Sequence, residues 1–172
     1  AHIKDGVAFT KFMYWLKTNI GKIEITEISA SDYLEERRKE QEGFIELSFN
    51  TISAYNANAA MMHYSATEES NAVLKPEGML LVDSGGQYFY GTTDITRTIP
   101  VGPCSELERK DYTLVLKAMI NLSMAVFPDG TPSCQLDALA RIHMWKSHRN
   151  YGHGTGHGIG FFSGVHEGPQ SI

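Results

Sequence analysis

The most distinctive segment of this chain reads GHGTGHGIG at residues 152–160, and VHEGP follows it at residues 165–169. These two motifs hold three of the seven histidines of the protein. The alternating glycines argue against a helix, because each one destabilises a helix interior by about 1 kcal/mol. We expect an extended or turning backbone in which His153 and His157 share a face. The pattern indicates a functional site, and the alternative is a glycine-rich turn with incidental histidines.

Two aspartates lie in a segment that we predict to be a β-hairpin. A turn at Tyr88 and Phe89 would place Asp83 directly opposite Asp94, with Cβ atoms about 4.5 to 5.5 Å apart. Like charges repel each other in that position, and a divalent cation between them would turn the repulsion into ligation. Carboxylates together with imidazole suit manganese, cobalt or zinc.

Each aspartate also has a structural interpretation. Asp83 could form an Asx turn over the residues that follow it, and Asp94 could pair with Arg97 or cap a bend. Tyr-Phe is an uncommon two-residue hairpin turn, and a bulge would shift the pairing by one residue. The hairpin alone therefore leaves both the metal site and the structural alternative open.

The composition is that of an ordinary folded domain. The chain has 172 residues, of which 42% are hydrophobic and 20% charged, and its net charge is -5. This acidic balance predicts no nucleic-acid partner, and no apolar run approaches the roughly 20 residues of a membrane span. We therefore expect no membrane partner and a cytoplasmic location. The run EERRKE at residues 35–40 is interpreted as a solvated helix face.

The predicted elements follow one order twice. Helices are predicted at residues 5–19, 26–41, 105–127 and 131–149. Strands are predicted near residues 44–49, 61–64, 79–83 and 91–98. Thr26 caps the second helix, and Ser105 with Glu108 forms a capping box for the third. The repeated order favours an α+β fold with two similar halves, residues 1–100 and 101–172, of which the second is truncated.

Five motifs in this order resemble a single family. They are MMHY at residues 61–64, DSGGQY at 83–88, TTDITRT at 92–98, HGTGHGIG at 153–160 and VHEGP at 165–169. Together they resemble the catalytic domain of the Xaa-Pro aminopeptidases (aminopeptidase P), along nearly the whole chain. The resemblance implies a pita-bread fold, in which two similar halves face each other around two divalent metal ions, most often manganese, with zinc or cobalt as alternatives.

The resemblance also implies roles for three metal ligands. Asp83 would bind one metal, Asp94 would bridge both, and His157 would bind the other. The metals would activate the scissile carbonyl and supply the nucleophile.

The remaining histidines of the motifs are implied to contact the substrate. His166 would lie near the scissile carbonyl, and His153 and His63 near the leaving prolyl residue. The implied substrate is a peptide with proline in second position, from which the N-terminal residue is removed. The bond is a tertiary amide, and proline has no backbone N–H and a fixed φ, so a dedicated pocket is expected. The family also allows a homodimeric parent protein.

The chain departs from the family pattern at its end. The family completes its metal site with two glutamates beyond the HEGP motif, and the chain stops at Ile172 before either. We therefore expect a fragment of the catalytic domain, without the family's N-terminal domains and C-terminal strands, that is inactive or nearly so. The alternatives are a prolidase or methionine aminopeptidase-type hydrolase on the same fold, and a non-catalytic pita-bread binding protein.

Overall fold

The structure is a computed structural model that describes residues 1–172 apart from the side chain of Gln170. The chain divides into two compact units. The first unit comprises Ala1–Cys104 and Ile159–Val165, and the second comprises Ser105–Gly158 and His166–Ile172. None of the described helices combines the length and the apolar character that a membrane crossing needs.

Two helices open the first unit. They are α1 (His2–Asn19) and α2 (Glu27–Lys39). The hydroxyl of Thr26 accepts a hydrogen bond from the Ser29 backbone N–H at 3.1 Å, and the Ser29 hydroxyl accepts one from the Thr26 N–H at 2.8 Å. This reciprocal capping box satisfies donors that the start of a helix leaves unpaired. The predicted cap at Thr26 is confirmed.

Six strands of the first unit form two antiparallel sheets. They are β1 (Phe44–Leu47), β2 (Ile52–Tyr55), β3 (Met79–Ser84), β4 (Gly86–Tyr88), β5 (Gly91–Thr92) and β6 (Ile95–Pro100). One sheet has the order β2-β3-β6 and the other β1-β4-β5. The predicted strands at residues 44–49 and 79–83 are confirmed. The single strand predicted at residues 91–98 is divided into β5 and β6, which belong to different sheets, and β2 was not predicted.

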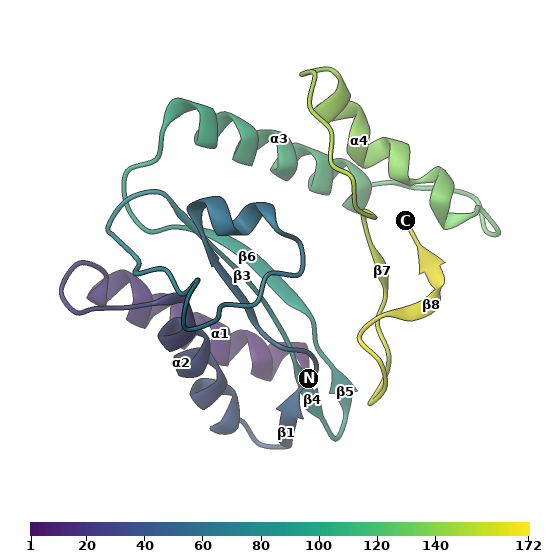
Figure 1. Cartoon of the computed structure of the whole chain (residues 1–172). Helices are drawn as coiled ribbons and strands as arrows, with labels where there is room; N and C mark the ends of the chain where they lie inside the picture. The colour runs from purple at the N-terminus through teal and green to yellow at the C-terminus, as the bar shows by residue number, and fades with distance from the viewer. The chain divides into compact units, whose positions relative to one another are not determined.

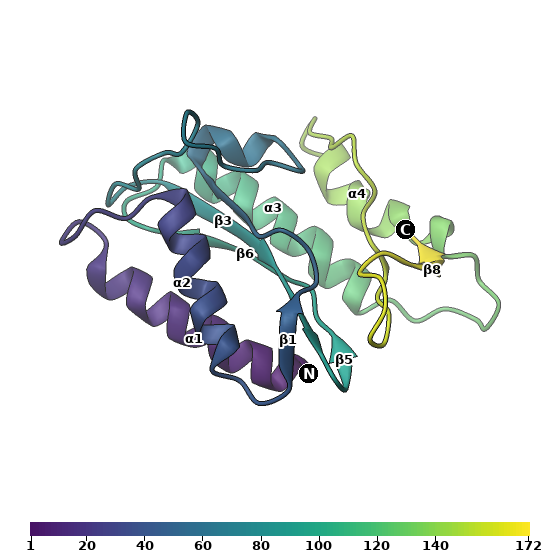
Figure 2. The same ribbon diagram turned by 60° about the horizontal axis from the view of Figure 1, so that its bottom comes forward.

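The core of the first unit lies between the two helices and one face of the sheet β2-β3-β6 (Figures 1 and 2). Leu80 and Val82 of β3 point to this face and pack in one cluster with Phe12 and Leu34. Burying a side chain of this size contributes about 1.5 to 3 kcal/mol. Because side chains alternate along a strand, Asp83 turns to the opposite face.

The hairpin from β3 to β6 passes from one sheet to the other at a junction formed by Gly85, Gly86, Thr93 and Asp94. A Cβ atom at Gly85 would lie 2.0 Å from the Thr93 carbonyl oxygen and 2.3 Å from Ser48 Oγ, so glycine is required. The Ser48 hydroxyl donates to the Thr93 carbonyl at 2.8 Å, and the Thr93 hydroxyl accepts from the Gly86 N–H at 2.8 Å. Side chains thus supply hydrogen bonds where the strand ladder is interrupted.

The predicted strand at residues 61–64 is wrong. Residues 61–64 form a bend and a turn that follow a 3-10 helix, η1 (Asn56–Ala60). Tyr64 explains the local path, because its ring is buried and its hydroxyl donates to Glu27 at 2.7 Å. A single anchored side chain, rather than an alternating pattern, therefore places this segment.

The second unit contains α3 (Glu106–Ser123), the 3-10 helix η2 (Ser133–Gln135), α4 (Asp137–Trp145), β7 (His157–Gly158) and β8 (Glu167–Ser171). The predicted capping box is confirmed, because the Glu108 N–H donates to Ser105 Oγ at 3.2 Å and the Ser105 N–H donates to Glu108 Oε2 at 2.6 Å. Both predicted helices are present, but α3 ends four residues earlier than expected, at Ser123. The helix predicted at residues 131–149 begins only at Asp137, after η2, and ends at Trp145, so the expected start at Thr131 is wrong.

Candidate metal centre

The two aspartates lie at the sheet junction of the first unit, in a register that differs from the predicted one. Asp83 pairs with Thr96 across β3 and β6, and the Thr96 hydroxyl donates to Asp83 Oδ1 at 2.6 Å. Asp94 lies two residues before Thr96, directly ahead of β6. In a strand ladder this spacing corresponds to the diagonal neighbour on the same face. The predicted directly opposed pair is therefore wrong, and the two aspartates lie on neighbouring segments, Asp83 in β3 next to the sheet junction and Asp94 within the junction.

The register differs because the hairpin turn lies one residue later than predicted. Tyr88 pairs with Gly91, so Phe89 and Tyr90 form the turn. Tyr88 cannot occupy a turn, because its ring is fully buried and its hydroxyl donates to Asp5 at 2.9 Å. Burial, together with the neighbouring Asp5 carboxylate, raises the pKa of the Tyr88 hydroxyl far above its ordinary value. The hydroxyl therefore remains a donor.

Two of the motif histidines meet in the second unit. The rings of His157 and His166 have centroids 4.3 Å apart and meet edge to face at 63°. His157 belongs to β7, which pairs antiparallel with β8. The expected extended or turning backbone is confirmed: His157 and Gly158 lie in a strand, and residues 152–156 form bends and irregular structure. Because His153 lies outside the strand, the shared face that an extended segment would give to His153 and His157 stays a prediction.

The backbone contacts of two histidines favour one tautomer of the neutral ring. Nδ1 of His157 lies 2.9 Å from the Gly158 carbonyl oxygen, and Nδ1 of His153 lies 2.8 Å from the Gly154 carbonyl oxygen. A carbonyl oxygen only accepts hydrogen bonds, so Nδ1 carries the proton in both contacts. In the neutral ring the lone pair is then on Nε2. This is the arrangement that metal-binding histidines adopt when a backbone carbonyl orients them.

Residues 151–160, which we call the glycine-histidine loop, are held by hydrogen bonds from helix α4. Arg141 donates to the Tyr151 carbonyl at 2.6 Å and to the His153 carbonyl at 2.8 Å. Asp137 accepts from the Thr155 hydroxyl and from Arg141 Nε. The Thr155 hydrogen bond, followed by Arg141, lowers the pKa of the Asp137 carboxyl. Neither residue was predicted from the sequence, although an Asp and an Arg four residues apart on a helix are the signal of such a pair.

The last predicted site residue, His63, lies in the first unit on an exposed turn. Its neighbour Tyr64 is anchored to the buried carboxylate of Glu27, which also accepts from the backbone N–H groups of Tyr55 at 2.6 Å and Ala72 at 3.0 Å. Burial raises the pKa of the Tyr64 hydroxyl, so this hydroxyl remains a donor to Glu27. The hydrogen bond that holds Tyr64 to the Glu27 carboxylate therefore also fixes the backbone position of His63.

The donors fit a borderline divalent metal ion. Asp83 and Asp94 supply carboxylate oxygens at one junction, and His157 supplies an Nε2 lone pair on a ring whose Nδ1 contacts a carbonyl. Asp83 and Asp94 belong to the first unit, and His157 belongs to the second. Among the described residues, no group of three or more His, Cys, Asp or Glu side chains is gathered as a metal-binding cluster.

Comparison with known proteins extends these observations. A probable Xaa-Pro aminopeptidase P of Paracoccidioides brasiliensis (strain Pb03) is 50% identical over 173 residues, which cover 99% of this chain and 28% of that protein. The structure of the X-prolyl aminopeptidase from Caenorhabditis elegans, described as a cytosolic enzyme with a di-nuclear active site, matches with a TM-score of 0.97 and 40% identity over 100% of this chain and 28% of its own. The Xaa-Pro dipeptidase from Bacillus anthracis matches with a TM-score of 0.81 and 30% identity, over 98% and 44% of the two chains.

These neighbours define the class of protein as the pita-bread metallohydrolases. Residues 1–172 match metallopeptidase family M24, and the chain belongs to this family. It spans 28% of the length of the curated relative from Paracoccidioides brasiliensis. The predicted α+β pita-bread fold is confirmed, while the division into two halves near residue 100 stays a prediction.

Proposed function

We propose that the protein carrying this chain is a metal-dependent aminopeptidase that removes the N-terminal residue from peptides with proline in second position. One observation carries the proposal: the relative that is 50% identical over 99% of this chain is a probable Xaa-Pro aminopeptidase P. Asp83, Asp94 and His157 are all present, which argues against a non-catalytic binding protein on the same fold. The hydrogen bond from Thr96 to Asp83 and the contact of His157 Nδ1 with the Gly158 carbonyl orient these two side chains as metal ligands are commonly oriented, which supports the same conclusion.

The proposed metal centre contains two divalent ions, most often manganese in the resembling family, with zinc or cobalt as alternatives. The dinuclear site of the Caenorhabditis elegans relative supports this number. Asp83 would bind one ion, Asp94 would bridge both, and His157 would bind the other through Nε2. Bound ions supply Lewis-acid activation of the scissile carbonyl and a nucleophile at neutral pH.

The histidines are proposed to recognise the substrate. His166, whose ring meets that of His157 at 4.3 Å, would donate a hydrogen bond to the scissile carbonyl oxygen. His153 and His63 would contact the prolyl residue. Proline offers no backbone N–H and has a fixed φ, so it is recognised through its ring and its carbonyl rather than through an amide donor.

A chimera tests the activity. This protein, which we call the chimera, is the Paracoccidioides brasiliensis relative in which this chain replaces the aligned region. We expect it to release arginine from the peptide Arg-Pro-Pro in the presence of manganese, and to leave Arg-Ala-Ala intact. The variants Asp83→Asn, Asp94→Asn and His157→Ala should abolish release and lower the manganese content measured by mass spectrometry. Release from Arg-Ala-Ala at a similar rate contradicts the proposal.

A second candidate is an Xaa-Pro dipeptidase, which the similarity to the Bacillus anthracis enzyme favours. The chimera separates the two with matched substrates, the dipeptide Arg-Pro and the tripeptide Arg-Pro-Pro. An aminopeptidase of the proposed kind prefers the tripeptide. Preference for the dipeptide would assign the chain to the dipeptidases.

The 172 residues alone are expected to show little or no turnover. No cluster of three metal-binding side chains is gathered within the described residues. A site with so few ligands binds a metal ion weakly. Full turnover by the isolated chain contradicts this expectation.

A cytoplasmic location is proposed by analogy with the cytosolic Caenorhabditis elegans relative. Light scattering of the chimera tests the homodimer that the family resemblance allows.

A further inference from the structure

The residues that neighbour the two aspartates point away from them into a buried polar cluster. Ser84 follows Asp83 and Thr93 precedes Asp94, and both Ser84 and Thr93 are fully buried. Successive side chains of an extended backbone point to opposite faces, so Ser84 lies on the helix side of β3 while Asp83 lies on the other. Whatever holds Ser84 and Thr93 therefore also constrains the backbone that carries the aspartates.

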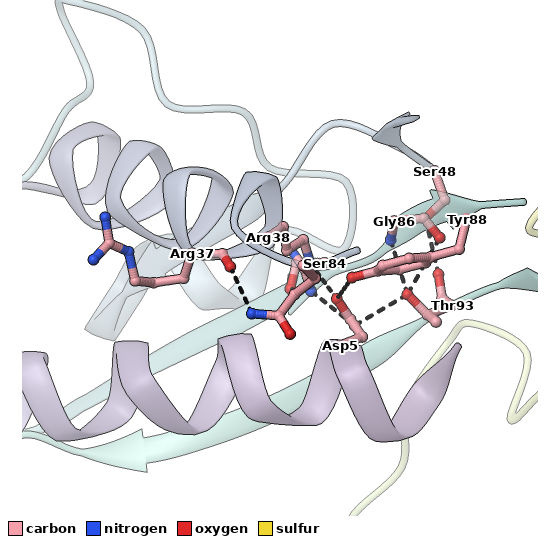
Figure 3. Close-up of polar contacts among 9 residues, drawn as sticks. Asp5, Arg37, Arg38, Ser48, Ser84, Gly86, Tyr88 and Thr93 are labelled. Atoms are coloured by element: carbon pink, nitrogen blue, oxygen red, sulfur yellow. Dashed lines mark hydrogen bonds and ion pairs between the residues drawn. The ribbon is translucent and has the colours of Figure 1, made fainter. Parts of the chain in front are cut away.

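The carboxylate of Asp5 is the centre of this cluster (Figure 3). It accepts from Arg38 Nε at 2.6 Å and Nη2 at 3.2 Å, from the Tyr88 hydroxyl at 2.9 Å and from the Thr93 hydroxyl at 3.0 Å. Arg38 Nη2 also donates to the Ser84 hydroxyl at 2.9 Å. One carboxylate and one guanidinium thus connect both strands of the hairpin to α1 and α2. We call Asp5, Arg38, Ser84, Tyr88 and Thr93 the Asp5 network.

The ion pair of Asp5 and Arg38 is stabilised by the positions of the two residues within their helices. Asp5 lies in the first turn of α1, where the helix dipole stabilises a negative charge, and Arg38 lies in the last turn of α2, where it stabilises a positive one. The prediction that residues 35–40 form a solvated face is wrong for Arg38, which is fully buried.

Stability alone does not explain the Asp5 network. A buried ion pair loses much of its Coulomb energy to desolvation, and apolar residues of similar volume often stabilise a protein as well or better. Arg38 Nη1 has no hydrogen-bond partner among the described residues, which adds to the energy needed to bury the guanidinium. The network instead fixes positions, because its charge-assisted hydrogen bonds hold α1, α2 and the two strands of the hairpin relative to one another.

We propose that the Asp5 network positions Asp83 and Asp94 for metal binding by fixing the backbone of Ser84 and Thr93. Asp5, Arg38 and Tyr88 are positioning residues in this proposal, and none of them contacts the metal. The inference rests on the proposed function, because it takes the two aspartates as metal ligands. Thr93 is its most direct member, since its hydroxyl links Asp5 to the Gly86 N–H across the sheet junction.

Two conservative variants of the chimera test the proposal without removing the buried charge. Thr93→Val keeps the shape of the side chain and removes the hydroxyl, and Tyr88→Phe removes the phenolic donor to Asp5. We expect each variant to raise the dissociation constant for manganese about 10-fold, as loss of outer hydrogen-bonding partners commonly does. Thr93→Ser keeps the hydroxyl and should restore the affinity.

The matched control is Tyr55→Phe. The Tyr55 hydroxyl donates to the Glu77 carbonyl at 2.7 Å in the same unit, and the side chain is buried like that of Tyr88. This variant also loses the hydroxyl of a buried tyrosine and its part-buried hydrogen bond, so it should lower the melting temperature without changing the affinity for manganese. Calorimetric titration with manganese alone and thermal unfolding of the metal-free protein give the two readouts.

The outcomes separate the two proposals. If Asp83→Asn weakens manganese binding while Thr93→Val and Tyr88→Phe bind manganese as tightly as the parent, the positioning role is overturned and the metal site stands. Equal loss of affinity in Tyr55→Phe also overturns it, because the effect would follow stability alone. If Asp83→Asn and Asp94→Asn both bind manganese normally, the proposed metal centre fails and the positioning role fails with it.

Discussion

Thr96 faces Asp83 across the ladder of β3 and β6, and its hydroxyl donates a hydrogen bond of 2.6 Å to the carboxylate. A donor of this kind orients a metal-binding carboxylate and limits its rotation. We predict that Thr96→Val weakens manganese binding by the chimera about 10-fold. Because Thr96 is exposed, its replacement should change the free energy of unfolding by less than about 0.5 kcal/mol.

Titration calorimetry with manganese measures this effect, and Thr96→Ser is the control because it keeps the hydroxyl. Unchanged affinity in Thr96→Val would mean that the Asp83 carboxylate does not depend on its cross-strand donor.

The buried carboxylate of Glu27 should contribute to the stability of the first unit. It accepts hydrogen bonds from Tyr55, Asn58, Tyr64 and Ala72. Glu27→Gln replaces one acceptor oxygen by a donor that faces other donors. We predict a loss of about 1 to 3 kcal/mol in the free energy of unfolding, the usual penalty for an unsatisfied buried polar group.

Urea unfolding of the 172-residue chain measures this loss. Glu24→Gln is the matched control, because the same change is made on an exposed side chain. Equal unfolding midpoints for the two variants would show that the Glu27 hydrogen bonds contribute nothing net.

Arg141 should control the order of the glycine-histidine loop. Its side chain binds the carbonyls of Tyr151 and His153, and the loop amide of Thr155 donates to the Ile172 carbonyl at 2.7 Å. We predict that Arg141→Ala increases the hydrogen-exchange rate of the Thr155 amide by at least about 10-fold, since charge-assisted hydrogen bonds contribute about 1.5 to 3 kcal/mol each.

Arg149→Ala is the control for this experiment. Arg149 makes an exposed ion pair with Asp111 at 3.2 Å in the same unit, and exposed pairs contribute little. Similar exchange rates in both variants would contradict the role of Arg141.

The second unit should lose stability in acid through Asp137. The Thr155 hydrogen bond, and then Arg141, lower its folded pKa below the ordinary value of 3.8. A carboxyl with a lowered folded pKa stabilises the fold above the unfolded pKa, and this contribution disappears as the pH falls through the folded pKa. We predict that Asp137→Asn removes part of the decline in melting temperature below about pH 5.

Melting curves of the chain across this acidic range test the prediction. At neutral pH, Asp137→Asn should be the less stable protein, and the two curves should converge in acid. Parallel curves at all pH values would show that Asp137 has the same pKa in the folded and unfolded chain.

Local signals in the sequence predicted local structure well. The cap at Thr26 and the capping box of Ser105 with Glu108 depend on residues at most three positions apart, so the sequence alone identifies them. The alternation that places Leu80 and Val82 on one face and Asp83 on the other is equally local.

The hairpin register could not be derived in this way. It depends on Tyr88, whose burial against Asp5 moves the turn to Phe89 and Tyr90. Asp5 lies 83 residues away in the sequence, and nothing near the hairpin indicates the contact. Arg38 was misinterpreted for the same reason, because its partner lies on another helix while its neighbours in the sequence are charged and exposed.

Gly85 has a consequence for directed evolution of this chain. A side chain at this position would collide with the backbone of Thr93, which cannot rotate away as a flexible side chain could. In a library that randomises residues 83–94, we therefore expect glycine at position 85 in every clone that still accumulates as folded protein, whether or not the clone retains activity. Selection for expression and selection for turnover would then act on codons only two positions apart: the first would fix glycine at position 85, and the second would fix Asp83.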